Sequence, residues 1–191
     1  MGPRKSNREI EVKIAVENLV HTKRLLARNG FCVARRRVFE RNQLFDTPTH
    51  SLRGQGKLLR IRQAGARSVL TFKGPGNGGK HKSREELEIE LPRQNRMATI
   101  LENTGFRPDF VYEKYRTEYQ QSPTDGVITL DETPIGFFLE LEGSPRWIDK
   151  TARTLGFAES QYITKSYGAL YLEYCNRARV KPSNMLFKET V

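Results

Sequence analysis

The amino-acid sequence predicts an α+β fold in which helices pack outside an antiparallel β-sheet. Apolar residues recur in the order strand, helix, several strands, short helix, several strands and two helices. This order lacks the regular strand–helix alternation of a parallel doubly wound sheet. Charged and apolar residues also alternate along most strands, so the sheet has one ionic and one apolar face. Such a sheet either stays open or closes into a barrel.

The first elements follow from this periodicity. Residues 9–14 alternate strictly, which predicts a strand with Glu9, Glu11 and Lys13 on one face. A helix is expected over residues 17–29, because apolar residues recur at helical spacing and Gly30 follows where a cap is needed. Four more strands are expected at residues 31–45, 57–63, 68–73 and 83–91.

The second half of the chain returns to helices twice. A short helix is expected over residues 95–103. Ser144 and Pro145 are typical of a helix start, and that helix runs to Gly156. A last helix begins near Ser166. Three strands lie between these helices, at residues 110–120, 126–131 and 136–142.

The length and charge of the chain favour one domain with an anionic partner. At 191 residues the chain can bury one substantial core. The formal net charge is +11, of which each end supplies +3. We therefore expect basic tails at residues 1–8 and 176–191 around a domain at residues 9–175, with the last dozen residues loose. Nucleic acid and small polyphosphates both suit a basic body.

Cysteine usage and hydropathy indicate the compartment. Cys32 and Cys175 are far apart and lack the spacing of a zinc site, which predicts two reduced thiols. No apolar run reaches the length of a membrane span or a signal-peptide core. We expect a soluble cytoplasmic protein without a membrane partner.

The ionic face of the predicted strands is sorted by charge. Carboxylates pair at i, i+2 on some strands, as in Glu140 and Glu142, and cations pair on others, as in Arg60 and Arg62. A wetted outer face would explain any one such strand. Repeated like-charge pairs are unfavourable, however, unless an opposite charge lies between them. Mg²⁺ or Mn²⁺ would satisfy the carboxylates, and phosphate oxygens would satisfy the cations.

The E-x-E-x-K pattern at Glu9, Glu11 and Lys13 resembles the opening signature of the CYTH family, named for the CyaB adenylate cyclase and thiamine triphosphatase. Further blocks appear in the order of that family. They are LLRIRQ at 58–63, LTFKGP at 70–75, SREELEIEL at 83–91, ITLDE at 128–132, LELEG at 139–143 and TKSY at 164–167. The resemblance extends from residue 9 to about residue 174.

This resemblance implies an eight-stranded antiparallel closed barrel whose lumen holds a triphosphate and one or two metal ions. The residues implied for substrate binding are Lys13, Arg60, Arg62, Lys73, Arg84, Lys114, Arg116 and Lys165. The residues implied for metal binding are Glu9, Glu11, Glu88, Asp131, Glu140 and Glu142. Four of these carboxylates, Glu11, Asp131, Glu140 and Glu142, are the implied catalytic residues. Lys13 could equally neutralise its two neighbouring glutamates.

Three functions are compatible with this residue set. REELEIEL and TKSY resemble the cyclase-like branch most closely, which implies a class IV adenylate cyclase converting ATP to cyclic AMP and pyrophosphate. The alternative is a triphosphatase acting on tripolyphosphate, thiamine triphosphate or a nucleoside triphosphate. The third is a non-catalytic module that binds polyphosphate or RNA ends.

Two other interpretations carry less weight. Aromatic and basic residues mix over 110–119, as in stacking platforms, but the glutamates of the ionic face would repel a nucleic-acid backbone. RNA 5′-triphosphate ends are still compatible with the charge pattern as ligands. An exposed apolar strand edge or helix face would favour a homodimer.

Residues 74–80 match the spacing of a P-loop, yet His81 follows in place of Ser or Thr, and no helix follows. We expect a mobile hairpin turn from which Lys80, His81 and Lys82 could reach over a substrate.

Overall fold

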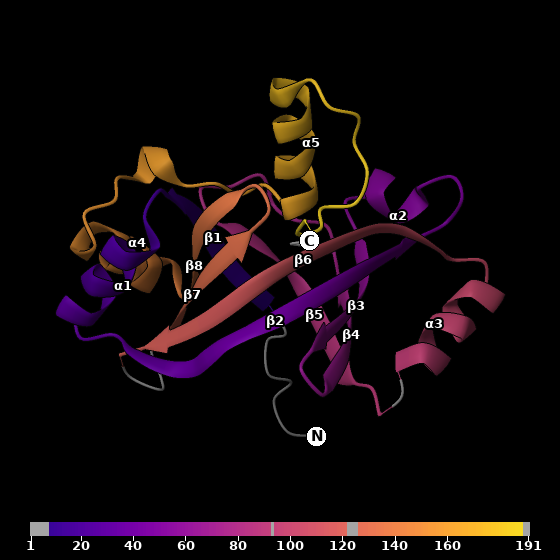
Figure 1. The fold of residues 1–191 in the computed structure, drawn as a ribbon, viewed down its shortest axis with the longest axis horizontal. Helices are drawn as coiled ribbons and strands as arrows, with labels where there is room; N and C mark the ends of the chain where they lie inside the picture. Colours follow the sequence, from indigo (N-terminus) through magenta and orange to yellow (C-terminus); the bar gives the residue numbers. More distant parts are fainter. Residues whose placement is uncertain (1–7, 93, 122–125, 189–191) are drawn as a thin grey trace.

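The computed structural model describes residues 8–92, 94–121 and 126–188, which form a closed antiparallel barrel of eight strands (Figure 1). The strand order around the barrel is β1–β5–β4–β3–β2–β6–β7–β8. This confirms the predicted closed barrel with helices outside. The strands are β1 Arg8–Val16, β2 Cys32–Asp46, β3 Leu58–Ala64, β4 Arg67–Lys73, β5 Lys82–Glu90, β6 Arg107–Gln120, β7 Gly126–Thr133 and β8 Gly136–Gly143.

The first strand closes the ring because it pairs on both edges. Glu9 of β1 lies opposite Arg84 of β5, and Lys13 lies opposite Glu140 of β8. Side chains of a strand alternate between two faces, so the charged residues of β1 point into the barrel and its apolar residues point out. The longest strands, β2 and β6, pair along most of their length, with register shifts such as that between Val33 and Arg35. Bulges of this kind increase the curvature of a sheet.

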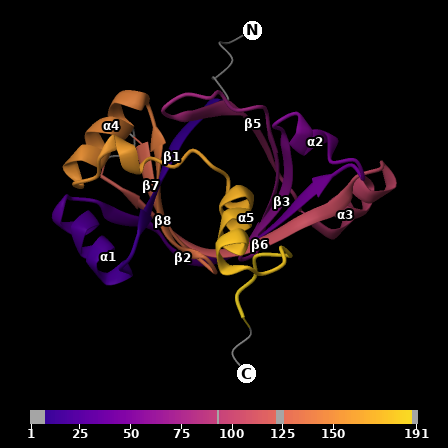
Figure 2. The ribbon, with the colours of Figure 1, turned by 90° about the horizontal axis from the view of Figure 1, so that it is seen from above.

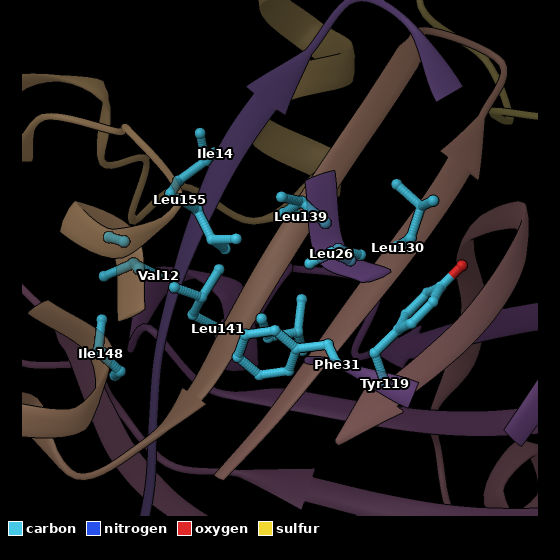
Figure 3. Close-up of a cluster of buried hydrophobic side chains, with 12 residues drawn as sticks. Val12, Ile14, Leu26, Phe31, Tyr119, Leu130, Leu139, Leu141, Ile148 and Leu155 are labelled. Carbon is cyan, nitrogen blue, oxygen red and sulfur yellow. The ribbon is translucent and has the colours of Figure 1, made fainter. Parts of the chain in front are cut away.

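The largest core cluster lies outside the barrel, beneath α1 (Leu19–Arg28) and α4 (Pro145–Thr154). Ser144 caps α4 as expected, because its Oγ accepts from Trp147 N at 3.3 Å. α1 begins two residues later than expected, where Asn18 Oδ1 accepts from His21 N at 2.9 Å. Figure 3 shows the apolar faces of the strands meeting the helices. The cluster consists of Val12, Ile14, Leu26, Phe31, Tyr119, Ile128, Leu130, Leu139, Leu141, Ile148, Ala152 and Leu155.

Two smaller clusters complete the core. On the outer surface, α3 (Gln94–Asn103) packs its Leu101 with Phe45 and Ile61. At one opening of the barrel, α5 (Tyr167–Ala178) lies across the ring of strands (Figure 2). Aromatic rings and two sulfur-containing side chains form a cluster on and beneath α5: Phe110, Tyr112, Phe138, Tyr167, Tyr171, Cys175 and Met185.

Two short elements were not expected from the sequence, α2 (Ser51–Gly54) and a 3₁₀ turn at Glu159–Gln161. α2 is held by Asp46, whose carboxylate accepts from the backbone N–H groups of Leu52 and Arg53 at 2.9 Å each. A carboxylate that caps a helix from several residues away leaves no hydrophobic period. The period-based prediction therefore missed this helix.

The C-terminal segment differs from the expected loose tail. Met185 is 1% exposed, and its N–H donates to Val111 O at 2.9 Å while its carbonyl accepts from Glu113 N at 2.9 Å. Residues 180–187 therefore pack along β6, and the expectation of looseness is wrong for them. The division into tails and domain stays a prediction, and residues 1–7 lie outside the described residues. No helix within the described ranges is long and apolar enough to cross a membrane.

Candidate active site

A cavity of about 950 Å³ runs through the barrel and opens beside α2 and α5. The ionic faces of the strands line it, as the charge sorting predicted. Twelve of the fourteen predicted site residues are in its wall. They are Glu9, Glu11, Lys13, Arg60, Arg62, Lys73, Arg84, Glu88, Lys114, Arg116, Glu140 and Glu142.

The carboxylates of β1 are paired with cations from three strands. Glu9 accepts from Lys73 Nζ of β4 at 2.6 Å, and Glu11 accepts from Lys13 at 3.1 Å and from Lys82 of β5 at 3.0 Å. Burial by itself raises the pKa of the Glu11 carboxyl, but Lys13 and the other cations hold it well below its usual range. Glu11 is therefore ionised at neutral pH.

Glu142 is the exception among the carboxylates of the lumen. It lies opposite Glu11 in the β1–β8 register, and its side chain has no hydrogen bond or ion pair among the described residues. Glu142 stays exposed to solvent, yet partial desolvation, Glu9 and Glu11 raise its pKa to about 7, while Lys73 opposes this shift. Glu142 therefore lies among carboxylates without forming an ion pair of its own within the described residues.

The cations of β6 depend on a buried carboxylate behind the wall. Asp131 is fully buried and does not line the cavity. It accepts from Lys114 Nζ at 2.8 Å and from Arg116 Nε at 2.7 Å. The oxygens of Asp131 are thus already engaged by cations, and Arg116 Nη2 bridges Asp131 and Glu140.

Two arginines of β3 line another part of the cavity wall. Arg60 is 7% exposed and donates to Tyr112 Oη at 3.2 Å and Thr71 Oγ1 at 3.3 Å. Arg62 donates to Glu88 at 3.3 Å. Hydrogen bonds hold both guanidinium groups, and both arginines line the cavity. Guanidinium groups placed in this way bind phosphate oxygens well.

Further charged residues belong to the cavity or its surroundings without being among the fourteen predicted site residues. Lys82, which was expected to reach over a substrate, and Glu86 line the cavity and continue the alternating face of β5. Glu40 of β2 is 1% exposed, with its carboxylate 3.6 Å from Lys114 Nζ. Burial opposes ionisation of Glu40, but Lys114 and its neighbours lower its pKa to about 2. The bulged β2 strand has no clean alternation, so no sequence signal marks Glu40.

Lys165 is not brought to the site. Its side chain is 56% exposed and pairs with Glu173 at 2.5 Å, outside the cavity wall. Lys80 and His81 also turn away from the lumen, toward Asp149 of α4 at 3.0 and 2.8 Å. The expected reach of these two residues over a substrate is therefore not observed, whereas Lys82 does face the cavity.

A second group of possible cation ligands lies beside α2. Candidate ligand atoms of Asp46, His50 and Asp109 lie within 4.8 Å of one another, so His50 is more than an isolated surface residue. None of the three is among the predicted metal ligands. Asp46 already accepts backbone N–H groups of α2, and Arg53 pairs with Asp109. These contacts account for the cluster without a metal ion.

A closed antiparallel barrel with a mixed ionic lumen defines the class of protein, and sequence comparison identifies the family within it. The profile of the CYTH domain matches residues 7–167. The chain therefore belongs to the CYTH domain family.

Related proteins cover nearly the whole chain. A protein of Methanocaldococcus jannaschii, provisionally named an adenylate cyclase, is 27% identical over 169 residues, covering 83% of this chain and 95% of the relative. A solved structure from Pyrococcus horikoshii is 26% identical with a TM-score of 0.72, covering 87% of this chain and 99% of its own. A provisionally named adenylyl cyclase from Hippeastrum, described as having a dominant triphosphatase activity, shares the fold at 20% identity, with a TM-score of 0.63 over 91% of this chain and 97% of its own.

Proposed function

We propose that this chain is a metal-dependent enzyme that acts on a triphosphate inside the barrel, with adenylate cyclase-like chemistry as the first candidate. The observation that carries the proposal is the meeting of both charge signs around one cavity. Cations from β3, β4, β5 and β6 face carboxylates from β1, β5 and β8. A triphosphate–metal complex needs both signs together, whereas a nucleic-acid backbone needs cations alone.

The cations would bind the phosphate oxygens. The side chains of Arg60 and Arg116 are largely buried, and hydrogen bonds already hold their guanidinium groups in place. Phosphate binding would therefore need little reorganisation of these two arginines. The proposed set is Arg60, Arg62, Lys73, Arg84, Lys114 and Arg116, with Lys13 shared between phosphate and Glu11.

The carboxylates fit a hard divalent cation. Glu9, Glu11, Glu140 and Glu142 would hold it, with Glu88 at the edge of the site. Glu142 supports this proposal because it lies among carboxylates and forms no ion pair within the described residues. Bound Mg²⁺ or Mn²⁺ would supply Lewis-acid polarisation of a phosphoryl group. Asp131 is better assigned to holding Lys114 and Arg116 than to metal binding, because it lies behind the wall.

In the cyclase reaction, the ribose 3′-oxygen of ATP bonds to the α-phosphorus and the bond from that phosphorus to the bridging oxygen breaks. Cyclic AMP and pyrophosphate result. Negative charge accumulates on the departing pyrophosphate, and the role of the lumen arginines and lysines is to stabilise that charge. The name of the Methanocaldococcus jannaschii relative agrees with this assignment.

Triphosphate hydrolysis is the second candidate. The same cations would hold the phosphate chain while water, in place of the ribose hydroxyl, attacks the terminal phosphorus. The dominant triphosphatase activity described for the Hippeastrum protein occurs on this fold. Tripolyphosphate, thiamine triphosphate and nucleoside triphosphates are the candidate substrates, and a non-catalytic module for polyphosphate or RNA ends is the remaining alternative.

Product analysis separates these candidates. The purified chain is incubated with ATP, and separately with tripolyphosphate, in Mg²⁺ and in Mn²⁺, and the products are resolved by chromatography. Cyclic AMP with pyrophosphate supports the cyclase, and ADP or orthophosphate supports the triphosphatase. Metal-dependent binding without any product would overturn the enzymatic proposal.

A further inference from the structure

Tyr167 is the first residue of α5 and places its ring at the wall of the cavity. Tyr167 as a whole is 5% exposed. Ser166 fixes the start of the helix, because its Oγ accepts from Ala169 N at 3.2 Å. The rings of Tyr112 and Phe138 pack against Tyr167 with centroids 5.8 and 5.6 Å away. The side chain therefore has one well-defined position inside the barrel opening.

The hydroxyl of Tyr167 completes the surroundings of Asp131. It donates to Asp131 Oδ2 at 2.7 Å, the oxygen that also accepts from Lys114 Nζ at 2.8 Å. Burial and the nearby carboxylates raise the pKa of Tyr167 well above its ordinary value, so the group stays a donor. Lysine, arginine and tyrosine donors thus surround the buried Asp131 carboxylate and restrict its rotation. The fixed carboxylate in turn restricts the position of the Lys114 ammonium group.

The ring of Tyr167 contacts two lumen cations directly. Lys13 Nζ lies 5.3 Å and Lys114 Nζ 5.2 Å from the ring centroid. An aromatic face attracts an ammonium group without neutralising it or consuming its N–H donors on an oxygen. The ring thus helps to hold both lysines without occupying the N–H donors that their carboxylate contacts leave.

We propose that Tyr167 is a positioning residue, through which the docking of α5 sets the placement of Lys13 and Lys114 for phosphate binding. This inference rests on the proposed function, because it concerns the same lumen. Tyr167 acts through the lysines and Asp131, so it does not itself need to contact phosphate. Deletion of its contacts therefore weakens triphosphate binding even though no phosphate ligand is removed.

The test uses diimidotriphosphate, a tripolyphosphate analogue with nitrogen bridges, titrated calorimetrically in Mg²⁺. Tyr167→Phe keeps the ring and loses the hydroxyl, and we expect about tenfold weaker binding, the effect of one charge-assisted hydrogen bond. Tyr167→Leu also loses the ring and should bind more weakly still. Tyr174→Phe is the matched control, because Tyr174 is on the same helix and 39% exposed. It should bind as the wild type does.

A double-mutant cycle with Lys114→Met separates positioning from general support of the fold. If Tyr167 acts through Lys114, Tyr167→Phe costs much less affinity when Lys114 is absent. Fully additive losses, or unchanged affinity in Tyr167→Phe, would overturn the positioning role while leaving the proposed function intact. A wild-type chain that fails to bind the analogue would overturn both.

Discussion

Charged residues inside the barrel differ in how completely they are paired. Glu9, Glu11 and Glu140 each contact at least one cation, whereas Glu142 has no such partner among the described residues and has a pKa raised to about 7. Glu142 is also exposed to solvent, so water weakens the repulsion from Glu9 and Glu11 in part. At the scale of single residues, Glu142 thus differs from these three carboxylates in having no ion pair.

Glu142→Gln tests the raised pKa of Glu142 through the thermal stability of the protein in metal-free buffer. The folded pKa of Glu142 lies above its ordinary value, so its stabilising contribution is full below about pH 4.5 and is lost as the pH rises through about 7. We therefore expect Glu142→Gln to match the wild type at pH 5 and to melt at a higher temperature at pH 9. Melting curves in EDTA at both pH values provide the measurement.

Addition of Mg²⁺ should reverse that order at pH 9, because the wild type alone keeps the ligand that gains from the ion. Glu173→Gln, an exposed partner of Lys165, is the control and should show neither effect. Equal melting temperatures of Glu142→Gln and wild type at pH 9 in EDTA would contradict the raised pKa.

Glu11→Ala should abolish turnover with Mg²⁺, by about 100-fold or more, with the fold intact. The change removes a proposed metal ligand, while Lys13 retains Glu140 as a partner at 3.2 Å. Product formation and circular dichroism are measured together, with Glu173→Ala as control. Near-normal activity of Glu11→Ala would remove Glu11 from the metal site.

Arg60→Ala should weaken binding of diimidotriphosphate by about 10- to 100-fold and binding of a monophosphate far less. A longer phosphate chain reaches more of the cation set, so a missing arginine matters more to it. Arg67→Ala removes an exposed arginine from the neighbouring strand and serves as control. Equal losses for both ligands would argue against a cradle for three phosphates.

At the scale of elements, the hairpin between β4 and β5 is fastened to α4 through one carboxylate. Asp149 accepts from Lys80 Nζ at 3.0 Å and Tyr162 Oη at 3.1 Å, and it contacts His81 Nε2 at 2.8 Å. Gly76 and Lys82, at either side of this turn, line the cavity. The glycine-rich loop is therefore tied down on one flank and borders the lumen on the other.

Asp149→Asn should release this loop. Without the charge on Asp149, the contacts of Lys80 and His81 weaken, and amide hydrogen exchange over residues 74–81 should rise by about tenfold. Lys150→Gln, on the same helix and exposed, should leave exchange unchanged. Exchange in Asp149→Asn that stays at the wild-type rate would show that the other contacts of the turn, such as the ion pair of Lys80 with Glu159, keep it closed.

At the scale of the whole molecule, the C-terminal segment and α5 complete one end of the barrel. Met185 forms a bridge with Tyr112 of β6 and belongs to the cluster beneath α5. The segment thereby encloses part of the cavity, because Pro182, Ser183 and Asn184 contribute to its wall. Residues at opposite ends of the chain thus enclose a single lumen.

Met185→Ala should lower the free energy of unfolding by about 2–4 kcal/mol, as expected for truncation of a fully buried methionine. Leu186→Ala, at a position 38% exposed, should lower it by less than about 1 kcal/mol. Urea unfolding of both variants supplies the comparison. Similar small losses would mean that the segment does not pack on β6 in solution.

Most of the fold was predictable because the strands obey a strong local rule. In β1 and β8, the residues Val12, Ile14, Leu139 and Leu141 recur at every second position and are buried beneath α1 and α4, so the period of two identifies both strands and their faces. Most of the predicted site residues line the cavity because they occupy the other half of that alternation. Lys165 lies outside the cavity wall, in a loop where no periodicity constrains the side chain.

The sequence by itself determined the strands, their ionic faces and the set of charges available for a triphosphate and a metal. Only the tertiary structure decided which charges meet. It placed Asp131 and Glu40 behind Lys114, left Glu142 without a cation and brought Tyr167 under two lysines. The physical reason is that alternation depends on neighbours along the chain, whereas charge pairing depends on barrel closure and register between strands distant in sequence.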